Sequence, residues 1–149
     1  MTAPHFHRFT VAVLALPDGR SWVLLEDLIF GDIVVPCGFI TDFASLPAPL
    51  RVWTNPWGRH GLAAIIHDRL YWSQQTSRRV ADEMFLRAMK ALYVRRTQAW
   101  ALYAGVRLFG WAAWRKNRQD REAGFSKVLR GTADELRAHV DQLWKESRG

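Results

Sequence analysis

The segment GFITDFASLP, residues 38–47, divides the chain into two parts with different patterns. Before it, short runs of apolar and β-branched residues are separated by turn residues, which is typical of strands. After it, a loop rich in proline and glycine leads into longer segments with helical spacing. We therefore expect an α+β fold in which a small N-terminal antiparallel sheet precedes a long ordered loop and a bundle of about four helices.

Three runs before residue 38 predict the strands. Residues 6–16 (FHRFTVAVLAL) begin with alternation and end at the turn sequence PDG of residues 17–19. Residues 21–25 (SWVLL) are placed to pair back across that turn, and residues 32–35 (DIVV) form a third extended run that Pro36 ends.

Helical signals begin at residue 61. The segment 61–72 is rich in Ala and Ile, and residues 74–77 (QQTS) then offer a break and an N-cap for a second helix. In that second helix the residues expected to face the core are Val80, Met84, Phe85, Ala88 and Leu92.

Residues 97–114 (TQAWALYAGVRLFGWAAW) are apolar on nearly all sides. Their uncharged part is shorter than the ~20 residues that a bilayer requires, and Arg107 interrupts it, so we expect no membrane span. A buried central helix is the favoured interpretation, and a helix that binds a membrane surface or a partner is the alternative. Further along, Thr132 and Glu135 form a capping-box pattern before one more amphipathic helix.

The length of 149 residues suits one domain with one core. Within it we expect strands mainly in 1–37, an ordered loop at 38–60, a helical core at 61–114, a basic connection at 115–131 and a C-terminal helix at 132–146. The single cysteine, Cys37, excludes an internal disulfide and a thiolate metal cluster, which suits a reducing cytosol. The N-terminus lacks the pattern of a secretory signal, so we expect synthesis and folding in the cytoplasm.

The charge is strongly positive, with a net value of +7 and an isoelectric point near 10.3. Such a balance favours acidic partners, which include nucleic acid, anionic lipid and acidic proteins. Many of the basic residues lie between Arg115 and Arg130. That stretch is interpreted first as a solvated connection and second as a nucleic-acid contact, which would weaken steeply with salt.

Candidate functional residues concentrate between Gly38 and Asp82. The loop carries Asp42 and Ser45 among bulky apolar residues, and the first helix carries the pair His67-Asp68. Asp82 on the next helix would come close to that pair in an antiparallel helical hairpin.

These residues allow three interpretations. Asp42, His67, Asp68 and Asp82 together would suit a divalent ion such as Zn, Mn or Mg. Alternatively His67 would act as a base that a carboxylate orients, with Asp42, Asp68 and Ser45 as the other catalytic candidates. The third interpretation is a hydrogen-bonded network that fixes the loop to the helices, and for Ser45 a structural role is favoured over catalysis.

Four segments in order, GFITDFASLP, AIIHDRLY, SRRVADEMFLRAM and AGVRLFGW, resemble the phage and prophage proteins known as domain of unknown function 1353. The resemblance covers about residues 22–114. It implies an origin in a tailed bacteriophage or prophage and no established activity. The polar positions that recur in the family map to Thr41, Asp42, Ser45, His67, Asp68, Tyr71, Asp82 and Arg107.

Two functions are therefore expected in competition. The first is a phage-encoded structural or assembly protein, associated with the virion, that binds a phage structural protein through aromatic and basic surfaces. The alternative is a small metal-dependent or His/Asp hydrolase that acts on a phage-relevant substrate such as peptidoglycan or a nucleotide. The sequence leaves the oligomeric state open.

Overall fold

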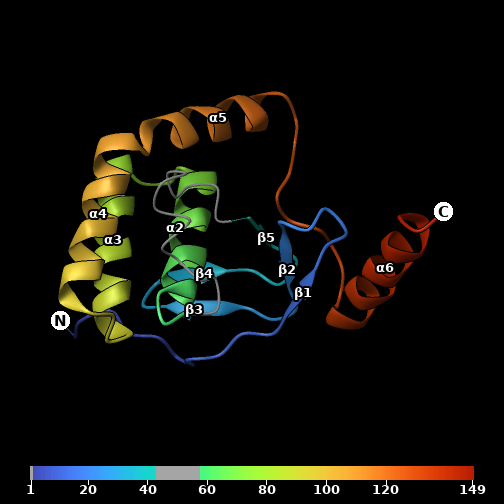
Figure 1. Cartoon of the computed structure of the whole chain (residues 1–149), viewed down its shortest axis with the longest axis horizontal. Coiled ribbons are helices and arrows are strands. Elements are labelled where there is room, and N and C mark those ends of the chain that lie inside the picture. Colours follow the sequence, from blue (N-terminus) through green and yellow to red (C-terminus); the bar gives the residue numbers. More distant parts are fainter. Residues whose placement is uncertain (1, 43–57) are drawn as a thin grey trace.

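The computed structural model describes residues 2–42 and 58–149, and within them it has an α+β fold, as predicted (Figure 1). The described elements are β1 (Val13–Ala15), β2 (Trp22–Leu24), β3 (Leu28–Phe30), β4 (Ile33–Val35), β5 (Ile40–Thr41), α2 (Gly61–Ser73), α3 (Arg78–Ala91), α4 (Arg96–Phe109), α5 (Trp111–Glu122) and α6 (Ala133–Glu146). The described helices therefore number five, where about four were expected. Most of the predicted loop 38–60 lies outside the described residues.

The strands form two small antiparallel sheets. The first has the order β1-β2-β5, with Leu14 opposite Val23 and Val23 opposite Ile40. The second is the hairpin of β3 and β4, in which Ile29 lies opposite Val34. The strand predicted for residues 6–16 is longer than β1, because only three of those residues pair as a strand. The short strands β3 and β5 were not predicted as separate elements.

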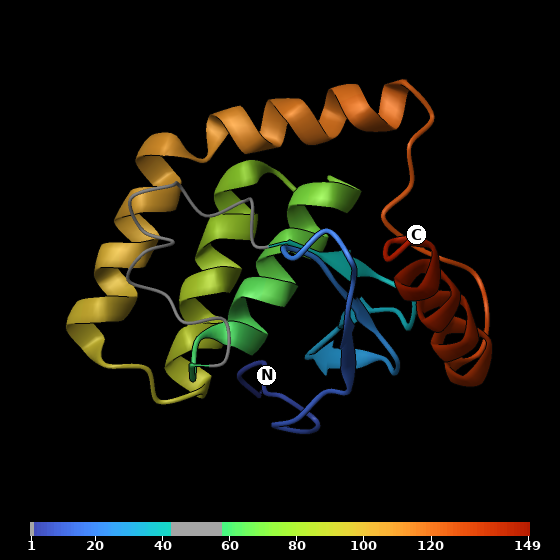
Figure 2. The same ribbon diagram turned by 45° about the vertical axis from the view of Figure 1, so that its right-hand side comes forward.

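Helix α2 is the central helix of the molecule. It packs against α3 and α5 on one side and against β4 and β5 on the other (Figures 1 and 2). Ala63, Ala64, Ile66 and Tyr71 are among its buried residues, and its burial extends over almost every face. An Ala- and Ile-rich segment suits this position, because small and apolar side chains allow close packing on all sides.

Helix α3 lies antiparallel beside α2 and begins where the sequence indicated. The Ser77 side chain accepts a hydrogen bond from the Val80 backbone N–H, which is the expected N-cap. The residues Phe85, Ala88 and Leu92 are buried, as predicted, whereas Val80 is exposed. A surface helix buries only one stripe of apolar side chains against its neighbours. Val80 lies at the edge of this stripe and is therefore exposed.

The expectation of a buried central helix at 97–114 is wrong. The chain turns at Gly110 and divides the segment into α4 and α5, which lie on the outside of α2 and α3 (Figure 2). In α4 only Ala99, Leu102, Gly105 and Val106 are buried. The apolar character of the segment therefore continues onto an exposed surface.

The expected basic connection at 115–131 is also shorter than predicted. Helix α5 continues to Glu122, and the following strand-like segment runs alongside the first sheet. The backbone of Ile40 donates to Lys127, and that of Leu129 donates to Gly38, so the segment adds to the sheet next to β5. A Cβ on Gly38 would lie 2.0 Å from the Leu129 carbonyl oxygen, and its φ of +86° also suits glycine.

Helix α6 covers the outer face of the first sheet. The predicted capping box is present, with Thr132 and Glu135 each accepting from the other's backbone N–H. Val140 packs with Leu16 and Val23, and the Trp144 indole donates a 3.0 Å hydrogen bond to the Ala15 carbonyl. Among the described residues, no helix has the length and the apolar character that crossing a membrane requires.

Candidate functional site: a buried polar network

Asp82 on α3 is the centre of a buried polar network. Its carboxylate has no exposed surface and accepts hydrogen bonds from residues of α2, α3 and α4. The donors are His67 at 2.8 Å, Tyr71 at 2.7 Å, Arg78 at 3.3 Å and Arg107 at 2.8 Å. An ionised carboxylate has about four acceptor positions, so these donors satisfy it.

The His67 and Tyr71 side chains approach Asp82 from the same face of α2. They lie four residues apart, and their ring centres are 4.1 Å from each other. Because an ionised carboxylate only accepts, the His67 Nε2–H is the donor of the 2.8 Å bond to Oδ1. The Tyr71 hydroxyl donates to the same oxygen.

The two arginines hold the other carboxylate oxygen and join α3 to the end of α4. Arg107 and Arg78 both donate to Oδ2 of Asp82. Arg78 also donates to the backbone carbonyls of Val106 at 3.0 Å and of Arg107 at 3.2 Å. These carbonyls lie in the last turn of α4, where a positive charge is favourable for the helix dipole.

The network shifts the pKa values of its members. Burial by itself raises the pKa of Asp82, but hydrogen bonds from His67, Tyr71 and Arg107 more than offset it, and the net pKa is lowered. Burial and the nearby Asp82 charge raise the pKa of Tyr71, so the phenol stays protonated as a donor. The hydrogen bond to Asp82 raises the pKa of Arg107. The network is therefore stable as a charged carboxylate with its donors.

Asp68 belongs to a second, separate contact. The Thr41 hydroxyl on β5 donates a 2.5 Å hydrogen bond to Asp68 Oδ2 on α2, and both side chains are buried. This bond connects the first sheet to the central helix. Because Asp68 follows His67 directly, the two side chains leave the helix in different directions, one toward the sheet and one toward α3.

The other predicted residues of the loop lie elsewhere. Asp42 is partly exposed and forms an ion pair of 3.7 Å with Lys127 of the segment that follows α5. Ser45 lies outside the described residues. Among the described contacts, His67 is bonded to Asp82, Asp68 to Thr41, and Asp42 is paired with Lys127.

The set proposed for a metal ion does not converge within the described residues. Over 2–42 and 58–149, no group of three or more His, Cys, Asp and Glu side chains is placed to hold a metal ion. His67 and Asp82 supply one nitrogen and one carboxylate, and the other neighbours of Asp82 are cationic or phenolic donors. Arginines in these positions compete with a cation for the carboxylate.

The chemistry open to the network is limited by its burial. A His–Asp pair at 2.8 Å resembles a base that a carboxylate orients. However, neither side chain has exposed surface, so a substrate does not reach the imidazole in this arrangement. The arrangement is suited to fixing three helices relative to one another.

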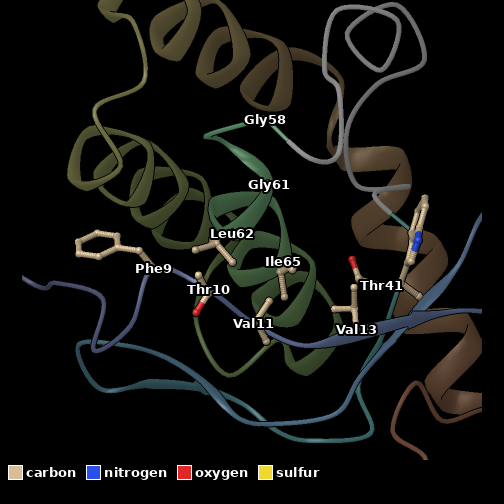
Figure 3. Close-up of a pocket in the computed structure, with 10 residues that line it drawn as sticks. Phe9, Thr10, Val11, Val13, Thr41, Gly58, Gly61, Leu62 and Ile65 are labelled. Atoms are coloured by element: carbon tan, nitrogen blue, oxygen red, sulfur yellow. The ribbon is translucent and has the colours of Figure 1, made fainter. Parts of the chain in front are cut away.

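A pocket of about 250 Å³ lies near Thr41 (Figure 3). Its lining comes from the N-terminal segment, β2, β5 and the start of α2, and it includes Phe9, Val11, Leu62 and Ile65. Neither His67 nor Asp82 lines it. The pocket and the buried network are therefore different parts of the molecule.

Arg78 of the network and Gly110 beside it were not among the residues singled out in the sequence. Arg78 was not singled out, although its spacing of four residues from Asp82 on one helix is a signal for an ion pair. Gly110 also belongs here, since a Cβ on it would lie 2.3 Å from the Tyr71 hydroxyl. The turn between α4 and α5 therefore fits closely over the network.

The fold and the network define a small α+β protein in which α2, α3 and α4 share a buried carboxylate. The chain belongs to the family described as protein of unknown function (DUF1353), whose family model matches residues 22–106. No curated protein and no solved structure matches the chain. The matched range contains His67, Tyr71, Arg78 and Asp82, and Arg107 is the residue directly after it.

Proposed function

We propose that the protein is a structural or assembly protein of a tailed phage or prophage, associated with the virion, that binds an acidic protein partner. The phage origin is what the four ordered sequence segments imply. The observation that carries a binding function is the exposed apolar corner, defined as Leu108, Phe109 and Trp111 at the junction of α4 and α5. Their side chains are 58–66% exposed. Exposed large apolar groups in one place favour a protein contact.

The surroundings of the apolar corner favour an acidic partner. Helix α5 continues from the corner with Arg115, Lys116 and Arg118, which are all exposed. Apolar side chains beside cations suit an interface in which the partner offers a hydrophobic pocket with a carboxylate rim. The network at Asp82 supports this function indirectly, because Arg78 and Arg107 fix the end of α4 that presents the corner.

The test compares phage that carry Phe109→Ser and Trp111→Ser together with phage that carry Phe125→Ser. Phe125 is an exposed aromatic residue outside the corner, and it serves as the matched control. We expect the corner variant to lose the protein from purified particles and assembly intermediates, measured by quantitative mass spectrometry, while the control keeps it. Absence of the unmodified protein from particles and intermediates would refute the proposal.

The His67–Asp82 pair is the observation that favours the alternative function, a hydrolase for peptidoglycan or a nucleotide. Its test is metal analysis of the native protein together with phage growth for His67→Gln and Asp42→Ala. Metal in stoichiometric amount, or hydrolysis that both substitutions abolish in folded protein, would favour the enzyme. Metal-free protein and unchanged growth for both would exclude it.

A further inference from the structure

Three exposed aromatic residues, from the N-terminal segment, the turn between α3 and α4, and α4 itself, line two neighbouring hollows. We call Phe9, Tyr93 and Trp100 the aromatic row; they are 62%, 79% and 45% exposed, respectively. One hollow is lined by both Phe9 and Tyr93, and a second is lined by both Tyr93 and Trp100. Their volumes are about 510 and 440 Å³. Tyr93 therefore lines both hollows, and each hollow has a second aromatic residue in its lining.

Among the residues that the structure describes, the lining of the two hollows includes cations and no Asp or Glu. Arg59 lines the first hollow, and Lys90 and Arg96 line the second. The Lys90 ammonium lies 5.3 Å from the centre of the Trp100 ring, so a cation is held at the aromatic wall. The charge is also one-sided in the sequence, because residues 84–119 contain eight Lys or Arg and no Asp or Glu.

The backbone holds Tyr93 in an outward position. Its φ of +55° is uncommon for a residue with a bulky side chain. The turn is kept by the Tyr93 N–H, which donates to the Lys90 carbonyl at 3.1 Å, and by the Arg59 guanidinium, which donates to the Tyr93 carbonyl at 3.4 Å. Arg59 thus connects the start of α2 to the residue that separates the two hollows.

We propose that the aromatic row and its cations bind single-stranded nucleic acid. Bases stack on exposed aromatic rings without regard to sequence, and the phosphates between them bind Lys and Arg. Each hollow has two aromatic residues and at least one cation in its lining, which suits a base with a phosphate beside it. An acidic peptide would use the cations but would leave the highly exposed Tyr93 ring without a partner. This inference concerns a different surface from the apolar corner and does not depend on the proposed function.

The experiment measures binding of a fluorescein-labelled oligothymidylate of about 16 nucleotides, the upper end of the site size of a small domain. Fluorescence anisotropy is recorded over a range of salt concentrations. The variants are Tyr93→Asn, Trp100→Ser and Lys90→Gln. Asparagine tolerates the positive φ at position 93, so that variant removes the ring with little effect on the turn. Phe125→Ser and Lys145→Gln are the matched controls, since both residues are exposed elsewhere.

We expect each aromatic variant to weaken binding about fivefold or more, because stacking contributes that much per base. Lys90→Gln should also reduce the slope of log affinity against log salt by about 0.7, the value for one phosphate on a single strand. The two controls should bind as the unmodified protein does. Circular dichroism and thermal unfolding establish that each variant is folded.

Three results would overturn the inference. The first is no binding of the oligonucleotide at low salt by the unmodified protein. The second is equal affinity of Tyr93→Asn, Trp100→Ser and the controls for the oligonucleotide. Two further variants, Arg115→Gln and Arg118→Gln on α5, belong to this test, and a loss of affinity in these two alone would place the binding surface on α5. The third is equally tight binding of a poly-glutamate peptide with the same losses, which would identify an acidic peptide as the ligand.

Discussion

Replacement of Asp82 by alanine tests the central role of the buried network. The change removes the acceptor of four donors and leaves Arg78 and Arg107 without their shared counter-charge. Removal of one partner of a buried ion pair costs about 3–5 kcal/mol of unfolding free energy. The arginine side chains are 23% and 31% exposed, so water compensates them in part and the lower end, about 3 kcal/mol, is expected.

Asp82→Asn provides a second and milder measurement. Its amide oxygen still accepts from the two arginines, and its amide nitrogen faces Tyr71 and His67. The Tyr71 hydroxyl can accept from that nitrogen, so this contact has a way to adjust. The remaining loss is the charge in the hydrogen bonds from His67, Arg78 and Arg107, and we expect about 2 kcal/mol.

The unfolding free energy of both variants is measured at pH 7 by urea unfolding followed by circular dichroism. The control is Asp141→Ala on the exposed side of α6, whose unfolding free energy should lie within about 0.5 kcal/mol of that of the unmodified protein.

Measurements in acid test the direction of the Asp82 pKa shift. The pKa of Asp82 is lowered in the folded protein, so its contribution is complete above the unfolded pKa of about 3.9 and disappears as the pH falls through the folded pKa. The difference between the unmodified protein and Asp82→Asn should therefore shrink below about pH 4.

Two results would contradict this reasoning. One is an unfolding free energy for Asp82→Ala within about 1 kcal/mol of the unmodified protein, which would mean that the donors find water instead. The other is a difference between the unmodified protein and Asp82→Asn that stays constant or grows in acid, which would mean that the carboxylate is not held in its charged form.

Three further changes test single contacts. Gly110→Ala places a Cβ 2.3 Å from the Tyr71 hydroxyl and 2.4 Å from the Val106 carbonyl oxygen and should cost about 1–3 kcal/mol in chemical unfolding; with Tyr71→Phe added, the combined loss should be smaller than the sum of the two single losses. Thr41→Val removes the donor to buried Asp68 and should cost about 1–3 kcal/mol in thermal unfolding, whereas Thr41→Ser should retain most of the stability. Thr132→Ala removes the N-cap of α6 and should raise amide hydrogen exchange in that helix by an amount equivalent to about 1 kcal/mol, with the amides of α2 unchanged. Wild-type behaviour in any of them would show that the contact contributes little.

Local patterns were sufficient to predict much of the fold. Ser77 and the Thr132–Glu135 capping box placed the starts of α3 and α6, because a cap depends only on neighbouring backbone groups. The same reasoning failed for residues 97–114. Apolar composition does not say whether a side chain faces the core or the surface, and the turn at Gly110 depends on a close fit against Tyr71.

The sequence by itself determined the α+β class, the helix starts and the region of residues 38–82 in which the polar residues gather. Only the tertiary structure decided how these residues combine, because the partners of Asp82 come from three helices and Thr41 reaches Asp68 from a strand. Adjacent residues on a helix point about 100° apart, so His67 and Asp68 serve different contacts although they are neighbours in the chain. The distances between side chains on different elements depend on how these elements pack. Packing therefore decided that Asp82 binds donors from three helices and does not join the proposed metal-binding cluster.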